Sequence, residues 1–280
     1  MNTIIPGNSN NSNKKDKPIY NYTNKLLTDN YKNLCIDKED ILPFFSDLTY
    51  YHPASDINKE IIDSKKHKSV LIDRKSIRVL TYNIFIRPIT KNNESDWKDE
   101  RLDDFLKILH NYDIICLQEM FGSFSNRKSK LIRAATKNGL FYYVELTPPN
   151  FYSKYLVDGG LLILSRFPII KYAIHHYDFG VVSDSLSQKG IIYVQIEIGE
   201  GILHLFNTHT QASYNNDLYD LFLACYKTRM HQINQLGKFI KTILSKEFVN
   251  NRDLSILCGD MNIDALKYHK CELVRITIVK

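Results

Sequence analysis

Residues 254–262 read LSILCGDMN, a short apolar run that ends on Asp260 and Asn262. A run of this length, with polar residues directly after it, predicts a buried β-strand that stops at the two polar side chains. Carboxylate and amide oxygens at such a place can hold a divalent cation or orient a phosphate. One strand end of this kind is weak evidence, so its repetition elsewhere in the chain matters.

Three other apolar runs end on side chains of the same chemistry. They read IRVLTYN (77–83), YDIICLQE (112–119) and LHLFNTH (203–209), and they end on Asn83, on Glu119, and on Asn207 and His209. Each has a plain alternative when taken singly, because an asparagine can be a turn residue, a glutamate can be solvated and a histidine can be structural. Strands buried on both faces bring their ends to a common rim, so the four ends together predict one site.

The residue types indicate which metal such a site would bind. Glu, Asp and Asn offer hard oxygen ligands, which suit Mg²⁺, with Mn²⁺ as the alternative, whereas a structural zinc site would need Cys and His at short spacings. A carboxylate-bound Mg²⁺ commonly takes further ligands from a substrate phosphate. The site therefore predicts hydrolysis of a phosphoester, with an imidazole moving protons and an Asp/Asn pair orienting the attacking water.

Longer amphipathic stretches alternate with the apolar runs from residue 77 onward. Residues 97–111 and 219–244 have this character, and the first carries apolar side chains at helical spacing, namely Leu102, Phe105, Leu106 and Leu109. The alternation predicts an α/β domain over residues 77–280. Residues 1–18 are rich in Asn, Ser and Lys and predict a disordered arm, and residues 19–76 predict an N-terminal extension packed onto the domain.

Composition adds few constraints. The net charge of +6 is small for 280 residues and does not select a nucleic-acid partner. The five cysteines form no C-x-x-C pair and mostly lie in apolar runs, so we expect reduced, buried thiols. No signal peptide is evident and no window is apolar enough to span a bilayer, which predicts a soluble, intracellular protein.

Five motifs, taken in order, resemble those of one known family. They read TYNIF (81–85), ICLQEMF (115–121), DGGLLILSRFPI (158–169), LFNTHTQAS (205–213) and CGDMNID (258–264). Together they resemble the endonuclease/exonuclease/phosphatase superfamily of DNase I-like, metal-dependent phosphodiesterases, and within it the neutral sphingomyelinase branch. The resemblance runs from residue 77 to about residue 264.

This resemblance implies a fold and a role for each matched residue. The fold is a four-layer α/β sandwich, in which two mostly antiparallel sheets pack together and helices flank them. Glu119 would bind the catalytic Mg²⁺ with help from Asn83. Asp260 and Asn262 would align the nucleophile and the phosphate, and His209 would contact the phosphate in the transition state.

Three further features of the family concern a hairpin, a lysine and the closing segment of the domain. The motif that starts at Asp158 implies a central hairpin, and Lys189 matches a family position, although we expect a solvated lysine there. The family closes with further strands and a Ser-Asp-His motif that supplies the general base, and neither follows Asn262 before the chain ends. The resemblance therefore predicts a C-terminally incomplete domain, with its last strands missing and its activity reduced or lost.

The leading prediction is a sphingomyelinase-like, Mg²⁺-dependent phosphodiester hydrolase. Its substrate would be a phospholipid or another phosphodiester, and a membrane surface is one candidate partner. Two alternatives stay open. One is a metal-dependent nuclease acting on nucleic acid, favoured by the basic run Asn126–Lys130, and the other is a non-catalytic scaffold remnant. Phe121, Phe124, Tyr155 and the pair Phe151–Tyr152 could touch lipid, but we expect them to pack in the core or at its rim. The sequence does not predict an oligomeric state.

Overall fold

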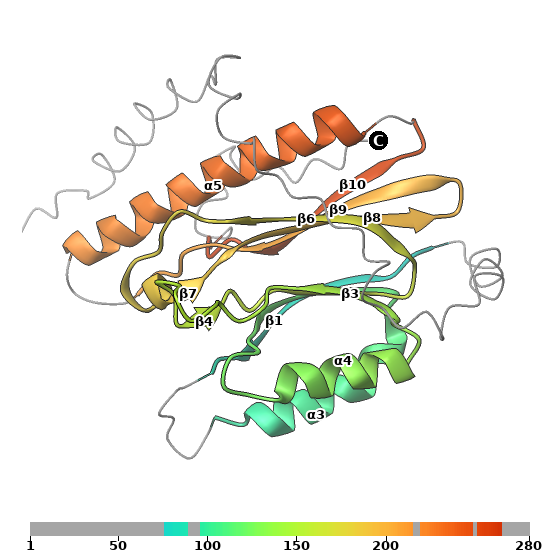
Figure 1. Ribbon diagram of the computed structural model, residues 1–280, viewed down its shortest axis with the longest axis horizontal. Helices are drawn as coiled ribbons and strands as arrows, with labels where there is room; N and C mark the ends of the chain where they lie inside the picture. Colours follow the sequence, from blue (N-terminus) through green and yellow to red (C-terminus); the bar gives the residue numbers. More distant parts are fainter. Residues whose placement is uncertain (1–75, 89–95, 215–218, 249–250, 265–280) are drawn as a thin grey trace, which may run out of the picture. The chain divides into compact units, whose positions relative to one another are not determined.

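A computed structural model describes residues 76–88, 96–214, 219–248 and 251–264 (Figure 1). All of them belong to the second of two compact units, residues 48–280, and the first unit, residues 1–47, lies outside the described residues. The predicted arm 1–18 and the predicted extension 19–76, apart from residue 76, also lie outside. So do residues 265–280, and the predicted C-terminal incompleteness therefore stays a prediction.

Two four-stranded sheets form the centre of the domain. The first has the order β1-β2-β5-β3, with bounds Val79–Ile86, Ile114–Met120, Leu162–Ser165 and Tyr142–Glu145. The second has the order β10-β9-β8-β6, with bounds Leu254–Asp260, Gly201–His209, Gly190–Ile198 and Ile169–His176. In each sheet one neighbouring pair is parallel and two are antiparallel. The prediction of mostly antiparallel sheets is confirmed.

Helices cover the outer faces of both sheets. Two of them, α3 (Lys98–Ile108) and α4 (Arg127–Lys137), lie against the first sheet, and α5 (Tyr219–Glu247) lies against the second (Figure 1). A short 3₁₀ helix, η3 (Leu109–Asn111), extends α3, so the helix predicted over 97–111 is confirmed, as is the longer one. The order helix, sheet, sheet, helix is the four-layer sandwich that the sequence predicted.

The alternation of side chains along β2 explains how the first sheet fills two cores. Ile114 and Cys116 belong to the apolar cluster between the sheets, whereas Ile115 and Leu117 belong to the cluster beneath α3 and α4. All four are fully buried, which is the pattern of a strand covered on both faces. The three cysteines in the described part of the chain, Cys116, Cys225 and Cys258, are free and buried, as predicted.

The third motif contains the predicted turn and buried strand, but the strand pairs with segments outside the motif, so no hairpin closes within it. The two-residue strand β4 (Val157–Asp158) pairs with β7 (Ser187–Gln188), while β5 pairs with β2 and β3. Asp158 is fully buried, and its Oδ1 accepts from the N–H of Gly160, which closes a turn at residues 158–160, while its Oδ2 accepts from a neighbouring loop. Another 3₁₀ helix, η4 (Val182–Leu186), precedes β7.

A pair of buried amides joins the two sheets. Gln118 Nε2 on β2 donates to Asn207 Oδ1 on β9 at 2.8 Å, and Asn207 Nδ2 donates to the carbonyl of Leu117 at 3.0 Å. Asn207, a candidate from the sequence, is therefore occupied with holding the sheets together. This contact also sets the carboxyl ends of β2 and β9 side by side.

Strand direction places the polar strand ends at one edge of the sandwich. Because β2 and β3 both run antiparallel to β5, and β6 and β9 both run antiparallel to β8, each sheet directs several carboxyl ends the same way. A side-chain contact joins Asn83, where the pairing of β1 with β2 shifts register, to Asp260 at the end of β10, so the two sheets meet at this edge. None of the helices described here is long and apolar enough to cross a bilayer.

Candidate active site

Asn83 lies at the centre of the candidate site and joins residues from both sheets. Its Nδ2 donates to Glu119 Oε1 at 3.1 Å and to Asp260 Oδ2 at 3.0 Å. Its Oδ1 accepts from the backbone N–H of Phe85 at 3.0 Å, which fixes the side-chain amide in this orientation. The Asn83 amide thus links Glu119 and Asp260, although Asn83 and Asp260 are 177 positions apart in the sequence.

Glu119 occupies an unusual backbone position next to an electropositive group. Its φ of 55° is left-handed, which is costly for a residue with a side chain and typical of functional sites. Its Oε2 is buried without a hydrogen-bond partner in the described part of the chain, and Arg87 Nε lies 3.9 Å away. Burial raises the pKa of Glu119, and the hydrogen bond from Asn83 and the charges of Lys189 and Arg87 counteract the rise.

The geometry around Glu119 depends on a glycine. Gly160 has a φ of 68°, and a Cβ at this position would lie 3.0 Å from the Cα of Glu119. Its carbonyl accepts from the N–H of Met120, directly after Glu119. A glycine is required here because the chain must approach the strained glutamate closely in a left-handed conformation.

His209 ends β9 and faces Glu119 from the second sheet. The histidine is 2% exposed, and its Nε2 lies 3.9 Å from Glu119 Oε1 and 3.5 Å from Lys189 Nζ. Burial, with the adjacent charge of Lys189, holds the pKa of His209 well below its ordinary value of 6.5. The imidazole is therefore neutral at pH 7, and because an ammonium can only donate, Nε2 is the acceptor in its contact with Lys189.

Asp260 and Asn262 form a tight turn at the end of β10. The N–H of Asn262 donates to Asp260 Oδ1 at 2.8 Å, and Asn262 takes a φ of 52°, which asparagine tolerates well. Its Nδ2 donates to the carbonyl of Thr210 at 3.0 Å. The structure thus brings all five predicted site residues together at one edge.

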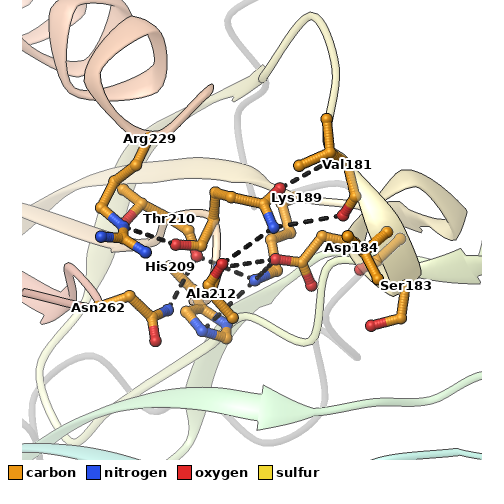
Figure 2. A network of polar contacts seen from close by, with 12 residues as sticks. Val181, Ser183, Asp184, Lys189, His209, Thr210, Ala212, Arg229 and Asn262 are labelled. Atoms are coloured by element: carbon orange, nitrogen blue, oxygen red, sulfur yellow. Dashed lines mark hydrogen bonds and ion pairs between the residues drawn. The ribbon is translucent and has the colours of Figure 1, made fainter. Parts of the chain in front are cut away.

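A buried ion pair completes the site, and its acidic member was not among the sequence candidates. Lys189 is 5% exposed, and its ammonium donates to Asp184 Oδ2 at 2.8 Å and to the Thr210 carbonyl at 2.9 Å (Figure 2). Asp184 also accepts from the N–H of Ala212 at 2.9 Å. The expectation of a solvated Lys189 is therefore wrong, because the loop after His209 folds over its side chain. The sequence signals for Lys189 were its match to a family position and its place directly before the residues of strand β8.

A second buried ion pair supports the loop that follows Glu119. Asp158 Oδ2 accepts from the backbone N–H groups of Gly122 and Ser123 at 2.8 and 2.9 Å, and its Oδ1 accepts from the N–H of Gly160 at 2.8 Å. Lys128, 3% exposed, reaches the same carboxylate at 3.3 Å. Asp158 therefore connects Gly160 with the loop after β2, the two segments that flank Glu119.

These residues fit a hydrated Mg²⁺ by donor chemistry. Among the described residues no group of three or more His, Cys, Asp and Glu side chains could enclose a metal ion. Mg²⁺ needs only one or two carboxylates because it keeps several waters, and the unpartnered Oε2 of Glu119 supplies such a ligand. Asn83 presents its NH₂ to both carboxylates, so the amide must turn over before its oxygen can contribute.

The basic run on α4 does not form an open cationic groove. Arg127 pairs with Asp99 at 2.8 Å, Lys130 pairs with Asp103, and Lys128 is buried as described above.

The expectation for the aromatic side chains is partly wrong. Phe121 is 6% exposed and packs inside, and Tyr155 is half-buried at the rim, as expected. The other three are strongly exposed, at 74% for Phe124, 97% for Phe151 and 94% for Tyr152.

Comparison with known proteins agrees with this geometry. A sphingomyelinase from Dictyostelium discoideum is 30% identical over 300 residues, covering 68% of this chain and 65% of the relative, so the chain spans under two thirds of that protein. The sphingomyelinase C structure from Streptomyces griseocarneus superposes with a TM-score of 0.57 at 23% identity, covering 69% of this chain and 66% of that one.

A variant beta toxin from Staphylococcus aureus, solved with bound magnesium ions, superposes with a TM-score of 0.55 at 22% identity, covering 67% of this chain and 65% of that one. At these identities the two solved structures show the fold alone. The model of the Endonuclease/Exonuclease/phosphatase family matches residues 80–270, and within that span lie every predicted site residue and both sheets except Val79. The chain belongs to this family and, within it, resembles the sphingomyelinase branch.

Proposed function

We propose that this chain is a Mg²⁺-dependent phosphodiesterase of the sphingomyelinase type, which hydrolyses the phosphodiester bond of sphingomyelin. One observation carries the proposal. Glu119 and Asp260 come from different sheets, yet one amide group holds both, and an oxygen of Glu119 stays buried and unpartnered. A hydrated cation is the ligand that such an arrangement suits. The similarity to the Dictyostelium sphingomyelinase supports a choline phosphodiester as the substrate.

The metal would be held by Glu119, with Asn83 after its amide has turned, and when bound it would neutralise charge on the phosphate and the leaving group. Asp260 has a carboxylate oxygen directed at Asn83 and can accept a hydrogen bond from the attacking water. Asn262 is fixed beside it by the Thr210 carbonyl and can donate to a phosphoryl oxygen. These residues orient the water and the phosphate.

Lys189 would supply positive charge to the phosphate, and His209 would supply a hydrogen bond. When a phosphoryl oxygen accepts a hydrogen bond from Lys189, Nε2 of His209 no longer has to accept that bond. The neutral ring can then hold its proton on Nε2 and donate a hydrogen bond to the same phosphate. The depressed pKa of His209 makes this neutral form available at pH 7. Asp184 holds the Lys189 ammonium in place.

Sphingomyelin hydrolysis in detergent micelles, with and without Mg²⁺, tests the proposal. We expect Mg²⁺-dependent release of phosphocholine and a loss of at least ~10²-fold with Glu119→Gln, which keeps the shape of the side chain and removes its charge. Glu197→Gln, an exposed glutamate on β8, is the matched control and should leave the rate unchanged. Equal rates for both variants would refute the site.

A plasmid-nicking assay on the same proteins separates the nuclease alternative. On α4, each of Arg127, Lys128 and Lys130 is paired with a carboxylate. These three residues therefore offer no free run of cations to the phosphates of DNA. We therefore expect no nicking above the level of Glu119→Gln. Nicking without lipid hydrolysis would assign the site to a nuclease instead.

A further inference from the structure

Two neighbouring aromatic side chains project from the loop between β3 and β4. Phe151 and Tyr152 are 97% and 94% exposed, above every other exposed large hydrophobic residue in the described ranges. Their rings meet edge-on, with centroids 5.8 Å apart. Single exposed apolar residues are ordinary, but an adjacent aromatic pair held this far out of the core marks an interaction site.

The base of this loop is fixed by several contacts. Lys154 Nζ donates to the carbonyl of Asp178 at 3.1 Å, and the hydroxyl of Tyr155 donates to the same carbonyl at 3.3 Å. The N–H of Leu156 donates to the carbonyl of Leu186 at 2.9 Å. Because three hydrogen bonds to two carbonyl groups hold the base, the aromatic pair is presented by a defined support.

The same support leads directly into the candidate site. Beyond the loop, Asp158 pairs with Gln188 in the β4–β7 ladder, and Lys189 follows Gln188. Asp158 also binds the loop after Glu119. The aromatic pair and the site therefore share one edge of the sandwich, and β4 and β7 connect them.

Other exposed apolar side chains surround the site on the same edge. They lie at or beyond the carboxyl ends of β1, β2, β3 and β6, and each is at least 41% exposed: Phe85, Phe124, Leu156, Phe179, Val182 and Leu186. Cations accompany two of the aromatic rings, with Arg87 4.3 Å from the Phe85 centroid and Lys154 5.0 Å from the Tyr155 centroid. The edge thus combines apolar groups with positive charges.

We propose that Phe151 and Tyr152 insert into the interfacial region of a phospholipid bilayer and hold the site against the lipid headgroups. Aromatic rings beside basic residues are the side chains that bind this region, because the rings enter the acyl boundary while the cations meet phosphates. The choice of a bilayer as partner rests on the proposed function, since a sphingomyelin phosphodiester lies in the headgroup layer. The loop supplies affinity for the surface and takes no part in bond cleavage.

Flotation of the full chain with vesicles of phosphatidylcholine alone tests the surface apart from catalysis. We expect wild type to float with the vesicles, and Phe151→Ser with Tyr152→Ser to lower the partition coefficient at least ~10-fold, since each ring loses apolar burial. The matched control changes two exposed residues at the opposite edge, Ile108→Ser with Ile170→Ser, and should float as wild type does. Phe151→Trp with Tyr152→Trp should retain binding.

Hydrolysis assays separate failure of this inference from failure of the proposed function. For the serine pair we expect slower hydrolysis of sphingomyelin in vesicles, with an unchanged rate on a short-chain sphingomyelin below its micellar concentration. Vesicle binding that depends on the loop, without any hydrolysis by wild type, would refute the function and keep the surface.

Equal flotation of wild type and the serine pair would overturn the inference, and so would absence of wild-type binding. Sedimentation velocity tests whether the loop instead binds a second copy of the chain. Self-association that the serine pair abolishes, without vesicle binding, would assign the loop to an interface between copies and overturn the bilayer proposal.

Discussion

Replacing Lys128 by methionine should destabilise the domain far more than replacing its neighbour Lys130. Lys128 is 3% exposed and contacts Asp158 at 3.3 Å, Glu145 at 3.1 Å and the Leu146 carbonyl at 2.8 Å. Removing one member of a buried ion pair costs about 3–5 kcal/mol, because the remaining charge stays buried without compensation.

The lower end of that range applies here. Without Lys128, the Asp158 carboxylate keeps its hydrogen bonds from the N–H groups of Gly122, Ser123 and Gly160. We therefore expect a loss of about 3 kcal/mol in the free energy of unfolding. With a urea dependence of roughly 2–3 kcal/mol per molar, the unfolding midpoint should fall by about 1–1.5 M.

The assay is urea unfolding followed by circular dichroism, with Lys130→Met as the control. Lys130 lies on the same helix and pairs with Asp103, but its side chain is 45% exposed, so its loss should cost no more than about 1 kcal/mol. Equal midpoint shifts for the two variants would refute the reasoning, because they would show that burial of the Lys128 pair contributes nothing to stability.

Three further predictions concern the metal, acid sensitivity and the backbone at the site. Calorimetric titration should show weak Mg²⁺ binding that Glu119→Gln largely removes and Glu197→Gln preserves, because a hard cation requires the charge; equal binding by both would contradict the assignment. Burial lowers the pKa of His204 below 6.5, so the unfolded state binds the extra proton first and stability should fall as the pH drops below 6.5. His204→Gln should lessen the decline in urea midpoint between pH 7.5 and pH 5.5, and an unchanged decline would show that other groups cause it. Gly160→Ala should lower the free energy of unfolding by about 1–2 kcal/mol, because residue 160 has a left-handed backbone and the new methyl group would meet Glu119. The same variant should bind Mg²⁺ more weakly, and full Mg²⁺ affinity would refute the close packing.

The local patterns predicted the parts of the fold that depend on neighbouring residues. The spacing of Leu102, Phe105 and Leu109 predicted α3, because a helix buries side chains that recur every three or four positions. The apolar runs predicted the strands, and their polar ends predicted the edge where Glu119 and Asp260 meet. In each case the signal and the structural feature occupy the same short stretch of chain.

The features that the sequence did not reveal depend on distant partners. Lys128 reads as one residue of a basic run, and only the approach of Asp158, 30 positions later, makes it a buried ion. The third motif reads as a hairpin, but β4 takes its partner from β7, whose position no local pattern indicates. Phe151 and Tyr152 read as core residues because hydrophobicity alone does not show which side of the chain is covered.

Because the amides of Gln118 and Asn207 join the two sheets, loss of cation binding should report separation of the sheets as one cooperative unit. The candidate ligands come from two separate sheets, and this contact is a buried polar link between them beside the site. A sandwich that opened along this plane would leave both amides without partners and would separate Glu119 from Asp260, so partial opening is energetically costly and also removes the ligand set. Protection of the Asn207 amide from hydrogen exchange should therefore follow the same free energy as loss of the site.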